Sequence, residues 1–119
     1  MKIAISSKGK DLDSPVDPRF GRAPYFIVVD TDSLEYEAVD NGANMNAFKG
    51  AGIQAAATVS QKGAKALLTG HCGPKAFQAL EAAQIKVAND VSGTVREAVA
   101  AYNEGNISFS DNPNTDAHW

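Results

Sequence analysis

The chain has 119 residues, of which 44% are hydrophobic and 21% charged, and its formal net charge is −3. This length and composition predict one domain with enough apolar material for a core. The acidic balance argues against a nucleic-acid-binding surface, which is normally basic, and no apolar run is long enough to span a membrane. We therefore expect neither a nucleic acid nor a membrane as a partner.

The cysteine content limits the chemistry further. Cys72 is the single cysteine, so the chain cannot form an internal disulfide, and this fits a reducing cytoplasm. One thiol also excludes a zinc or iron–sulfur site built from several cysteines of one chain. The apolar start, residues 1–5, is too short for a signal peptide and predicts a first strand. We expect a cytoplasmic protein.

Hydrophobic periodicity predicts alternating strands and helices along the chain. The strands are expected at residues 3–5, 25–30, 34–40, 64–69 and 85–88, and the helices at 51–61, 74–83 and after Thr94. Thr94 and Glu97 have the spacing of a capping box. The order β-β-β-α-β-α-β-α predicts an α/β fold with a mixed five-stranded sheet in three layers.

The helix at 51–61 is expected to have one apolar face rich in small residues, formed by Ile53, Ala56, Ala57 and either Val59 or Ser60. Residues 6–24 and 41–46 are expected as loops, because they contain glycine, proline and asparagine and lack periodicity. Residues 1–107 are expected to form a single domain. Residues 108–119 are expected to be a mobile tail, although Ile107 and Phe109 could dock on the domain.

The segment Thr-Gly-His-Cys-Gly-Pro at 69–74 joins a predicted strand to a predicted helix. In open α/β sheets such turns hold ligands, because backbone N–H groups and the positive helix end converge there. Cys72 offers a soft thiolate and His71 an imidazole, which suit a metal or a metal–sulfide cluster. The helix N-terminus is expected to lower the thiol pKa, and Gly70 and Gly73 argue against a core position. The alternatives are a small buried core cysteine and an ordinary turn histidine.

Two arginines flank Phe20-Gly21 in the first long loop. Arg19 and Arg22 could supply the positive charge that an anionic ligand needs in an acidic protein. The alternative is a structural role, in which these arginines satisfy loop carbonyls or pair with Asp13 or Asp17. If the sheet is mixed as expected, this loop and the His71-Cys72 turn lie toward one edge of it.

Asn44, Met45 and Asn46 precede the helix at 51–61 and offer amide donors and a thioether. Ordinary turn chemistry is the alternative for these three residues. Gly50 and Gly52 could let backbone N–H groups approach an anion, but this spacing alone is a weak signal.

The run Asp-Pro-Arg-Phe-Gly-Arg-Ala-Pro-Tyr-Phe at 17–26 resembles the dinitrogenase iron–molybdenum cofactor biosynthesis family. The Met-Lys-Ile-Ala start, the Asn-rich loop near Asn44, the Gly-Pro at 73–74 and the Thr-Val-Arg-Glu-Ala run at 94–98 agree with it in register. The resemblance covers residues 1–107 and is strongest to members that carry a molybdenum–copper sulfide cluster. In one respect the chain departs from the family: many members have histidine where this chain has Arg19.

The resemblance implies a ribonuclease H-like fold and a single cluster-binding domain at 1–107. It also implies binding of a molybdenum–copper sulfide cluster, or a related molybdenum–iron–sulfur cluster, and suggests protein partners in cluster assembly. The expected cofactor-binding residues are Arg19, Arg22, Asn44, Met45, Asn46, Gly70, His71, Cys72 and Gly73. Cys72 and His71 are the expected metal ligands, and no residue is expected to be catalytic.

Three classes of function are compatible with the sequence: a cluster carrier, an enzyme and an interaction module. A non-enzymatic cluster carrier explains the 69–74 segment and the arginine loop. A nuclease would need carboxylates around Mg²⁺, and the first strand lacks one; a thiol-dependent transferase lacks an orienting third residue. A metal-free interaction or regulatory module of a larger complex remains the alternative to the carrier.

Overall fold

The structure is a computed structural model that describes residues 1–45 and 50–110. Its centre is one five-stranded sheet in the order β3-β2-β1-β4-β5. The strands are β1 (Lys2–Ser7), β2 (Tyr25–Asp30), β3 (Tyr36–Asp40), β4 (Ala66–Leu68) and β5 (Lys86–Ala88). β2 pairs antiparallel with β1 and β3, whereas β1, β4 and β5 are parallel. The expected α/β fold with a mixed five-stranded sheet is confirmed.

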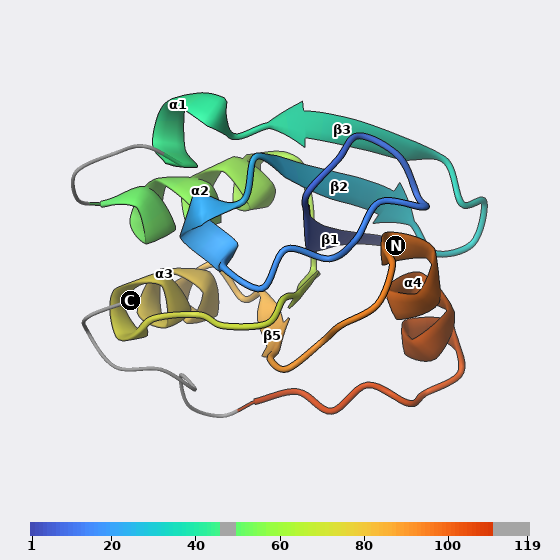
Figure 1. Cartoon of the computed structure of the whole chain (residues 1–119). Coiled ribbons are helices and arrows are strands. Elements are labelled where there is room, and N and C mark those ends of the chain that lie inside the picture. The colour runs from blue at the N-terminus through green and yellow to red at the C-terminus, as the bar shows by residue number, and fades with distance from the viewer. Residues whose placement is uncertain (46–49, 111–119) are drawn as a thin grey trace.

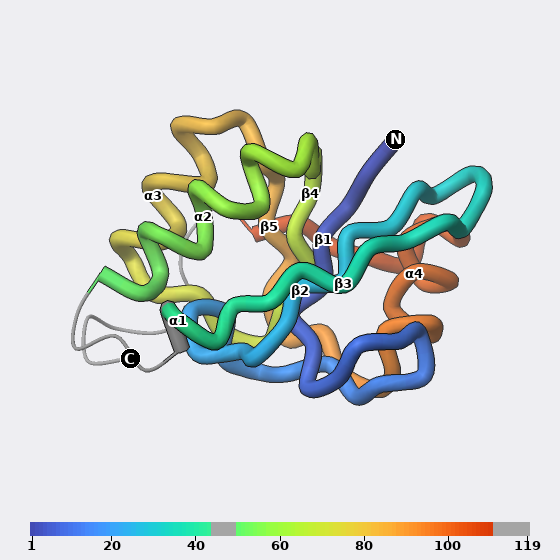
Figure 2. The backbone as a smooth tube through the Cα atoms, turned by 90° about the horizontal axis from the view of Figure 1, so that it is seen from above, coloured from blue at the N-terminus to red at the C-terminus, as the bar shows by residue number. Residues whose placement is uncertain are grey.

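Helices cover both faces of this sheet (Figures 1 and 2). α2 (Ala51–Gln61) and α3 (Pro74–Ala82) lie on one face, and α4 (Val95–Asn103) lies on the other. Side chains of β1 alternate accordingly: Ala4 packs with the α2–α3 side, and Ile3 and Ile5 pack with the α4 side. Two apolar cores therefore sit above and below one sheet, which gives three layers.

Two short helices occur where the sequence predicted loops. The 3-10 helix η1 (Phe20–Arg22) follows β1 and its long loop, and α1 (Gly42–Met45) follows β3. Phe20 is 2% exposed, and its ring centroid lies 5.2 Å from that of Phe26. Burial of this one aromatic side chain fixes the turn that carries Arg19 and Arg22, and local periodicity could not reveal it.

The expected apolar face of α2 is wrong at two positions. Ile53 is 46% exposed and Ala57 is exposed, while the helix buries Ala51, Ala55, Ala56 and Val59. The buried face consists of small residues because α2 approaches its neighbours closely. A Cβ built on Gly52, which lies on this side, would stand 2.8 Å from the Cβ of Ala76 in α3. Close packing, rather than the largest apolar side chain, decides which face is buried.

The end of the described chain runs along β5. The Ser110 N–H donates to the Val87 carbonyl at 2.7 Å, and the Phe109 ring lies 6.3 Å from that of Tyr102. Residues 111–119, with most of the expected tail, lie outside the described residues. Within the described part, no helix combines the length and apolarity needed to cross a membrane.

Candidate anion-binding site

The arginine loop and the His71 turn meet at one edge of the sheet. β1 and β4 are parallel, so the chain leaves both at the same edge. There Arg19 and His71 form an isolated parallel bridge. The Phe20 N–H donates to the His71 carbonyl at 3.2 Å, and the His71 N–H donates to the Pro18 carbonyl at 2.6 Å. The expectation that these two loops meet is confirmed.

Glycines allow the close approach of these segments. A Cβ on Gly70 would lie 2.6 Å from the Cα of Pro18, so a side chain at this position would push the two loops apart. A Cβ on Gly21 would lie 2.9 Å from the backbone nitrogen of Gly52 at the start of α2. The fold itself therefore explains why these two positions hold glycine.

Gly73 has a different environment. Its φ of −71° and ψ of 167° suit any residue, and a Cβ there would meet no atom within 4 Å. Neither backbone conformation nor crowding within the described chain requires glycine at the start of α3. A glycine in open space leaves room for a ligand to approach the backbone.

The N-termini of α2 and α3 lack side-chain caps. Gly50 and Gly73 occupy the cap positions, and neither first turn contains an acidic residue. In α4, by contrast, Thr94 and Glu97 form the predicted capping box. The first N–H groups of a helix carry partial positive charge and bind anions where no side chain satisfies them. The side of the sheet that holds the arginine loop therefore presents two uncapped helix N-termini.

Charged side chains surround the start of α3. The Arg19 side chain is 50% exposed, with its Nε 3.6 Å from Oδ1 of Asp17. That carboxylate is buried and also accepts the Arg19 N–H at 2.9 Å, so the anticipated pairing with Asp17 occurs and holds the arginine in place. Arg22 is half-buried in η1. Lys75, an exposed cation in the first turn of α3, was not singled out from the sequence.

The acidic partners near this group are few. Besides Asp17, the exposed Asp90 is held beside the turn because its N–H donates to the Gly70 carbonyl at 2.8 Å. Arg19, Arg22 and Lys75 are thus carried by the segments that meet here, in a chain whose net charge is negative. The arrangement suits an anion with several acceptor atoms.

The structure corrects two expectations for Cys72. The residue is 1% exposed and belongs to the core between the sheet, α2 and α3, so its glycine neighbours do not keep it at the surface. Burial raises the pKa of the thiol from 9.0 to about 12, in the direction opposite to the one expected from the helix. A shift of this size corresponds to roughly 4 kcal/mol, whereas a helix N-terminus contributes at most about 1 kcal/mol to an exposed charge. Loss of solvation therefore outweighs the helix dipole.

The donor set does not suit a bare metal ion. Across residues 1–45 and 50–110, no three side chains of His, Cys, Asp or Glu gather in a way that could hold one. Cys72 is protonated in the core and His71 is half-buried in the turn. A preassembled anion that brings its own sulfide ligands fits these residues better, because hydrogen bonds and charge can hold it.

The third expected segment is described only in part. The backbone of Asn44 and Met45 belongs to α1, which contacts both η1 and α2. The side chains of these two residues and all of Asn46 lie outside what the structure describes. Their assignment to the site stays a prediction.

Asn89 is a residue that sequence reasoning missed. It directly follows β5, and both polar atoms of its amide are buried without a hydrogen-bond partner. The available signal was its position, because polar residues just after parallel strands often contact ligands in α/β folds.

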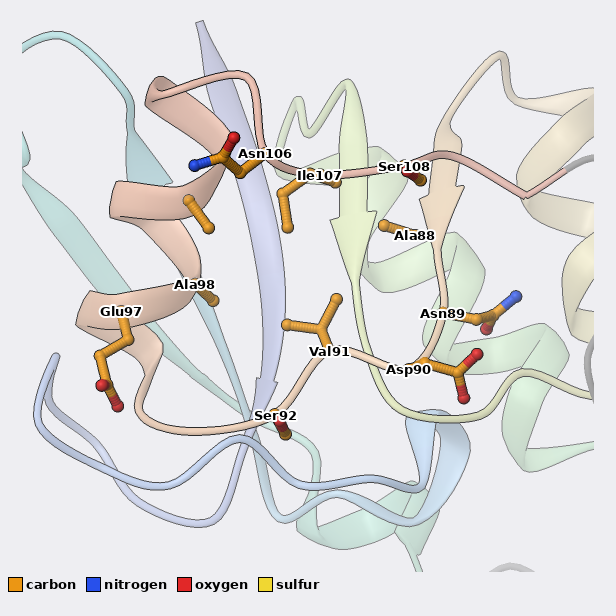
Figure 3. A pocket seen from close by; sticks show the side chains of 11 residues that line it. Ala88, Asn89, Asp90, Val91, Ser92, Glu97, Ala98, Asn106, Ile107 and Ser108 are labelled. Carbon is orange, nitrogen blue, oxygen red and sulfur yellow. The ribbon is translucent and has the colours of Figure 1, made fainter.

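A cavity of about 340 Å³ lies on the opposite face of the sheet, between β5, α4 and residues 106–108 (Figure 3). Val91, Ala98 and Ile107 contribute apolar walls, and Asp90 and Glu97 contribute carboxylates. No lysine, arginine or histidine lines it, so the cavity does not suit an anion.

Comparisons with known proteins show relatives of this chain. The family model described as "Dinitrogenase iron-molybdenum cofactor" matches residues 1–105. The apo form of the orange protein from Desulfovibrio gigas is 50% identical over 96% of each chain, with a TM-score of 0.94. A putative NifB protein of the DUF35 family from Thermotoga is 40% identical over 91% of each chain, with a TM-score of 0.79.

A more distant structure shows the fold alone. A putative dinitrogenase from Methanocaldococcus jannaschii is 19% identical, covers 95% of this chain and 97% of its own, and has a TM-score of 0.70. Among curated proteins, none matches the chain. Because the family model matches nearly the whole chain, the protein belongs to the dinitrogenase iron–molybdenum cofactor family.

Proposed function

We propose that the protein binds and carries an anionic, molybdenum-containing metal–sulfide cluster and does no catalysis. The molybdenum–copper sulfide form is the specific cluster we propose, on the 50% identity to the orange protein. The observation that carries the proposal is the backbone pairing of Arg19 with His71 beside the uncapped N-terminus of α3. This pairing brings a positive side chain beside a helix whose cap position offers no side-chain hydrogen bond, a combination that suits a multiply charged anion.

Charge and hydrogen bonds hold the cluster in this proposal. Arg19, Arg22 and Lys75 balance its charge, and the N–H groups of the α3 first turn and the His71 imidazole donate to its sulfide or oxo atoms. Cys72 contributes a core wall, and a direct thiolate bond would first have to overcome the raised pKa of that thiol. Asn44, Met45, Asn46 and Gly73 complete the proposed surface, and the buried Gly70 supports it as a spacer against Pro18.

Reconstitution tests this function directly. The purified protein is mixed with tetrathiomolybdate and Cu(I), desalted, and analysed for molybdenum, copper and visible absorption. We expect molybdenum and colour to elute with the protein. If the desalted protein holds neither, the carrier function is wrong, and the metal-free interaction module becomes the better description.

A matched pair of charge variants tests the site. Arg19→Gln should lower the retained molybdenum several-fold, because it removes a cation beside the α3 N-terminus. Arg96→Gln makes the same charge change on α4, where Arg96 Nε pairs with Asp13 at 2.9 Å on the other face of the sheet. We expect that variant to retain molybdenum like the wild type. Equal losses in both variants would show that overall charge, and not this site, controls binding.

Four further assignments accompany the proposal. The ribonuclease H-like classification draws support from the sheet order, in which β2 alone runs against the other four strands. A single cluster-binding domain at 1–107 and a cytoplasmic location stay predictions. So do protein partners in cluster assembly.

A further inference from the structure

We propose that Asn89 is a binding residue of this site, whose side-chain amide hydrogen-bonds the bound anion. The inference rests on the proposed function and adds a residue to it. Both Nδ2 and Oδ1 of Asn89 are buried and lack a hydrogen-bond partner in the described protein. They are the only buried side-chain nitrogen or oxygen atoms of the described residues in this state.

The strand pattern places Asn89 on the face that carries the site. Val87 packs in the core with α2 and α3, and Ala88 packs in the core with α4. By alternation the side chain of the next residue returns to the α2–α3 face. Figure 3 shows the Asn89 side chain on the opposite side of the β5 backbone from Ala88, although Asn89 also borders the α4 cavity.

Backbone hydrogen bonds hold Asn89 beside the turn of the site. The Thr69 N–H donates to the Ala88 carbonyl at 3.0 Å, and the Thr69 carbonyl accepts the Val91 N–H at 3.0 Å. These two bonds bracket Asn89, and the Asp90 N–H adds a third bond, to Gly70. α3 packs against β5 on the same face. Asn89 therefore lies next to Thr69 and Gly70, at the start of the turn that leads into α3.

A buried side-chain amide without hydrogen-bond partners lowers the stability of the free protein. A buried polar group without a partner loses its hydrogen bonds to water and gains none in return. Other buried polar side chains near it are satisfied: the Ser6 hydroxyl reaches the Asp17 carbonyl at 2.7 Å and the Thr69 hydroxyl at 2.8 Å. Ser6, Thr69 and Asn89 occupy equivalent positions on three neighbouring strands. The first two have hydrogen-bond partners, whereas the Asn89 amide has none in the described protein.

A bound anion would supply the missing partner. The amide NH₂ donates to sulfide or oxo atoms, in the same direction as the uncapped N–H groups of α3. Because both polar atoms of the amide are closed to solvent in the free protein, ligand contact requires a local movement of the chain around them.

Substitutions separate a binding role from a structural one. Asn89→Leu keeps the approximate shape and removes all hydrogen bonding, and Asn89→Ala removes the amide with less volume. Asn106→Ala is the matched control, because that asparagine is exposed beyond α4 and lines the cavity on the other face. Each protein is dialysed against tetrathiomolybdate alone, and bound molybdenum is measured.

We expect both Asn89 variants to bind tetrathiomolybdate about tenfold more weakly, the effect of losing a hydrogen bond to a charged group. Asn106→Ala should bind like the wild type. Without ligand, Asn89→Leu should melt at or above the wild-type temperature, because it removes an unsatisfied polar group. Wild-type affinity in both Asn89 variants would overturn the inference and leave the carrier function standing. A clear drop in the melting temperature of Asn89→Leu would show a structural role instead.

A spectroscopic measurement follows the amide itself. In ¹⁵N-labelled protein, the side-chain NH₂ signals of Asn89 are identified by their absence from the Asn89→Ala spectrum. We expect them to shift on addition of tetrathiomolybdate, while those of Asn106 stay in place. Unshifted Asn89 signals in a wild-type sample that binds molybdenum would reject the inference alone, whereas no binding at all would reject the proposed function with it.

Discussion

Two residues of the 69–74 segment have roles that their neighbours in the sequence do not reveal. Cys72 looked like an exposed ligand and is a core residue, and Gly70 looked like part of an anion loop and is a spacer against Pro18. In both cases a segment more than ten residues away, or a helix on the sheet, decides the role. Each role has a measurable consequence.

Cys72 should make the fold sensitive to alkaline pH. Its folded pKa of about 12 lies above the ordinary 9.0, so burial of the neutral thiol contributes stability that is complete below pH 9 and is lost as pH rises toward 12. We expect the unfolding free energy of the wild type to fall more steeply over this range than that of Cys72→Ala, as measured by urea denaturation. Parallel slopes would contradict a buried neutral thiol.

Gly70→Ala should destabilise the protein by roughly 1–3 kcal/mol, as overpacking does. The new Cβ would lie 2.6 Å from the Cα of Pro18 and 2.8 Å from its carbonyl oxygen, so the backbone must move. Gly9→Ala offers a comparison, because there a Cβ would meet the small Ser14 side chain, at 2.4 Å from its Oγ. Thermal unfolding of both variants measures the difference in destabilisation. Equal melting temperatures would show that the paired loops at Pro18 and Gly70 can move apart at little cost in stability.

At the scale of elements, the helices differ in how their N-termini are satisfied. α4 has a complete capping box, in which Thr94 Oγ1 accepts the Glu97 N–H at 3.1 Å and Glu97 Oε1 accepts the Thr94 N–H at 2.9 Å. α2 and α3 begin with glycine and have no such cap. A side chain thus satisfies the first turn of the helix on the far face, whereas the cap positions of the two helices beside the arginine loop provide no such bond, as the proposed site requires.

Gly73→Asp should therefore improve stability and weaken binding together. The extended backbone at this position suits a cap residue, and an aspartate there would accept the N–H groups of the α3 first turn. We expect a gain of a few tenths of a kcal/mol over glycine and a marked loss of tetrathiomolybdate binding. Gly73→Ala is the control without a cap or charge. Undiminished binding by the aspartate variant would mean that the α3 N-terminus does not contact the anion.

At the scale of the whole molecule, the sheet separates two faces of different chemical character. The α4 face holds one apolar core and a cavity without cationic residues, and the other face gathers Arg19, Arg22, Lys75 and two uncapped helices. In the proposed site, attraction between the anion and these cationic side chains supplies part of the affinity.

Salt should weaken anion binding as a result. Exposed charges such as Arg19 and Lys75 are screened when the Debye length falls from about 10 Å at 0.1 M to about 3 Å at 1 M. We expect the affinity for tetrathiomolybdate to fall with added potassium chloride, and the salt dependence to be shallower in Arg19→Gln than in the wild type. Equilibrium dialysis at several salt concentrations measures both slopes. A salt-independent affinity would point to direct ligation instead of charge.

Much of the architecture was accessible from local pattern. The bounds of β2 and α2, the capping box of α4 and the mixed five-stranded sheet agree with the sequence predictions, because each depends on periodicity or on a residue and its near neighbours. The meeting of the Arg19 loop with the His71 turn also followed, since parallel strands end at one edge of a sheet. The buried face of α2 did not follow, because tight contact with α3 favours small residues over Ile53.

The sequence by itself determined most of the elements, the family and the segments that meet beside α3. Only the tertiary structure decided which side chains within those segments are buried and which are exposed. Burial depends on what packs against a residue from elsewhere in the chain, so neither the protonated core state of Cys72 nor the unpaired amide of Asn89 can be read from local spacing. The two glycines of this turn also differ only through tertiary contacts. A side chain at Gly70 would collide with Pro18, whereas a Cβ at Gly73 would meet no atom within 4 Å.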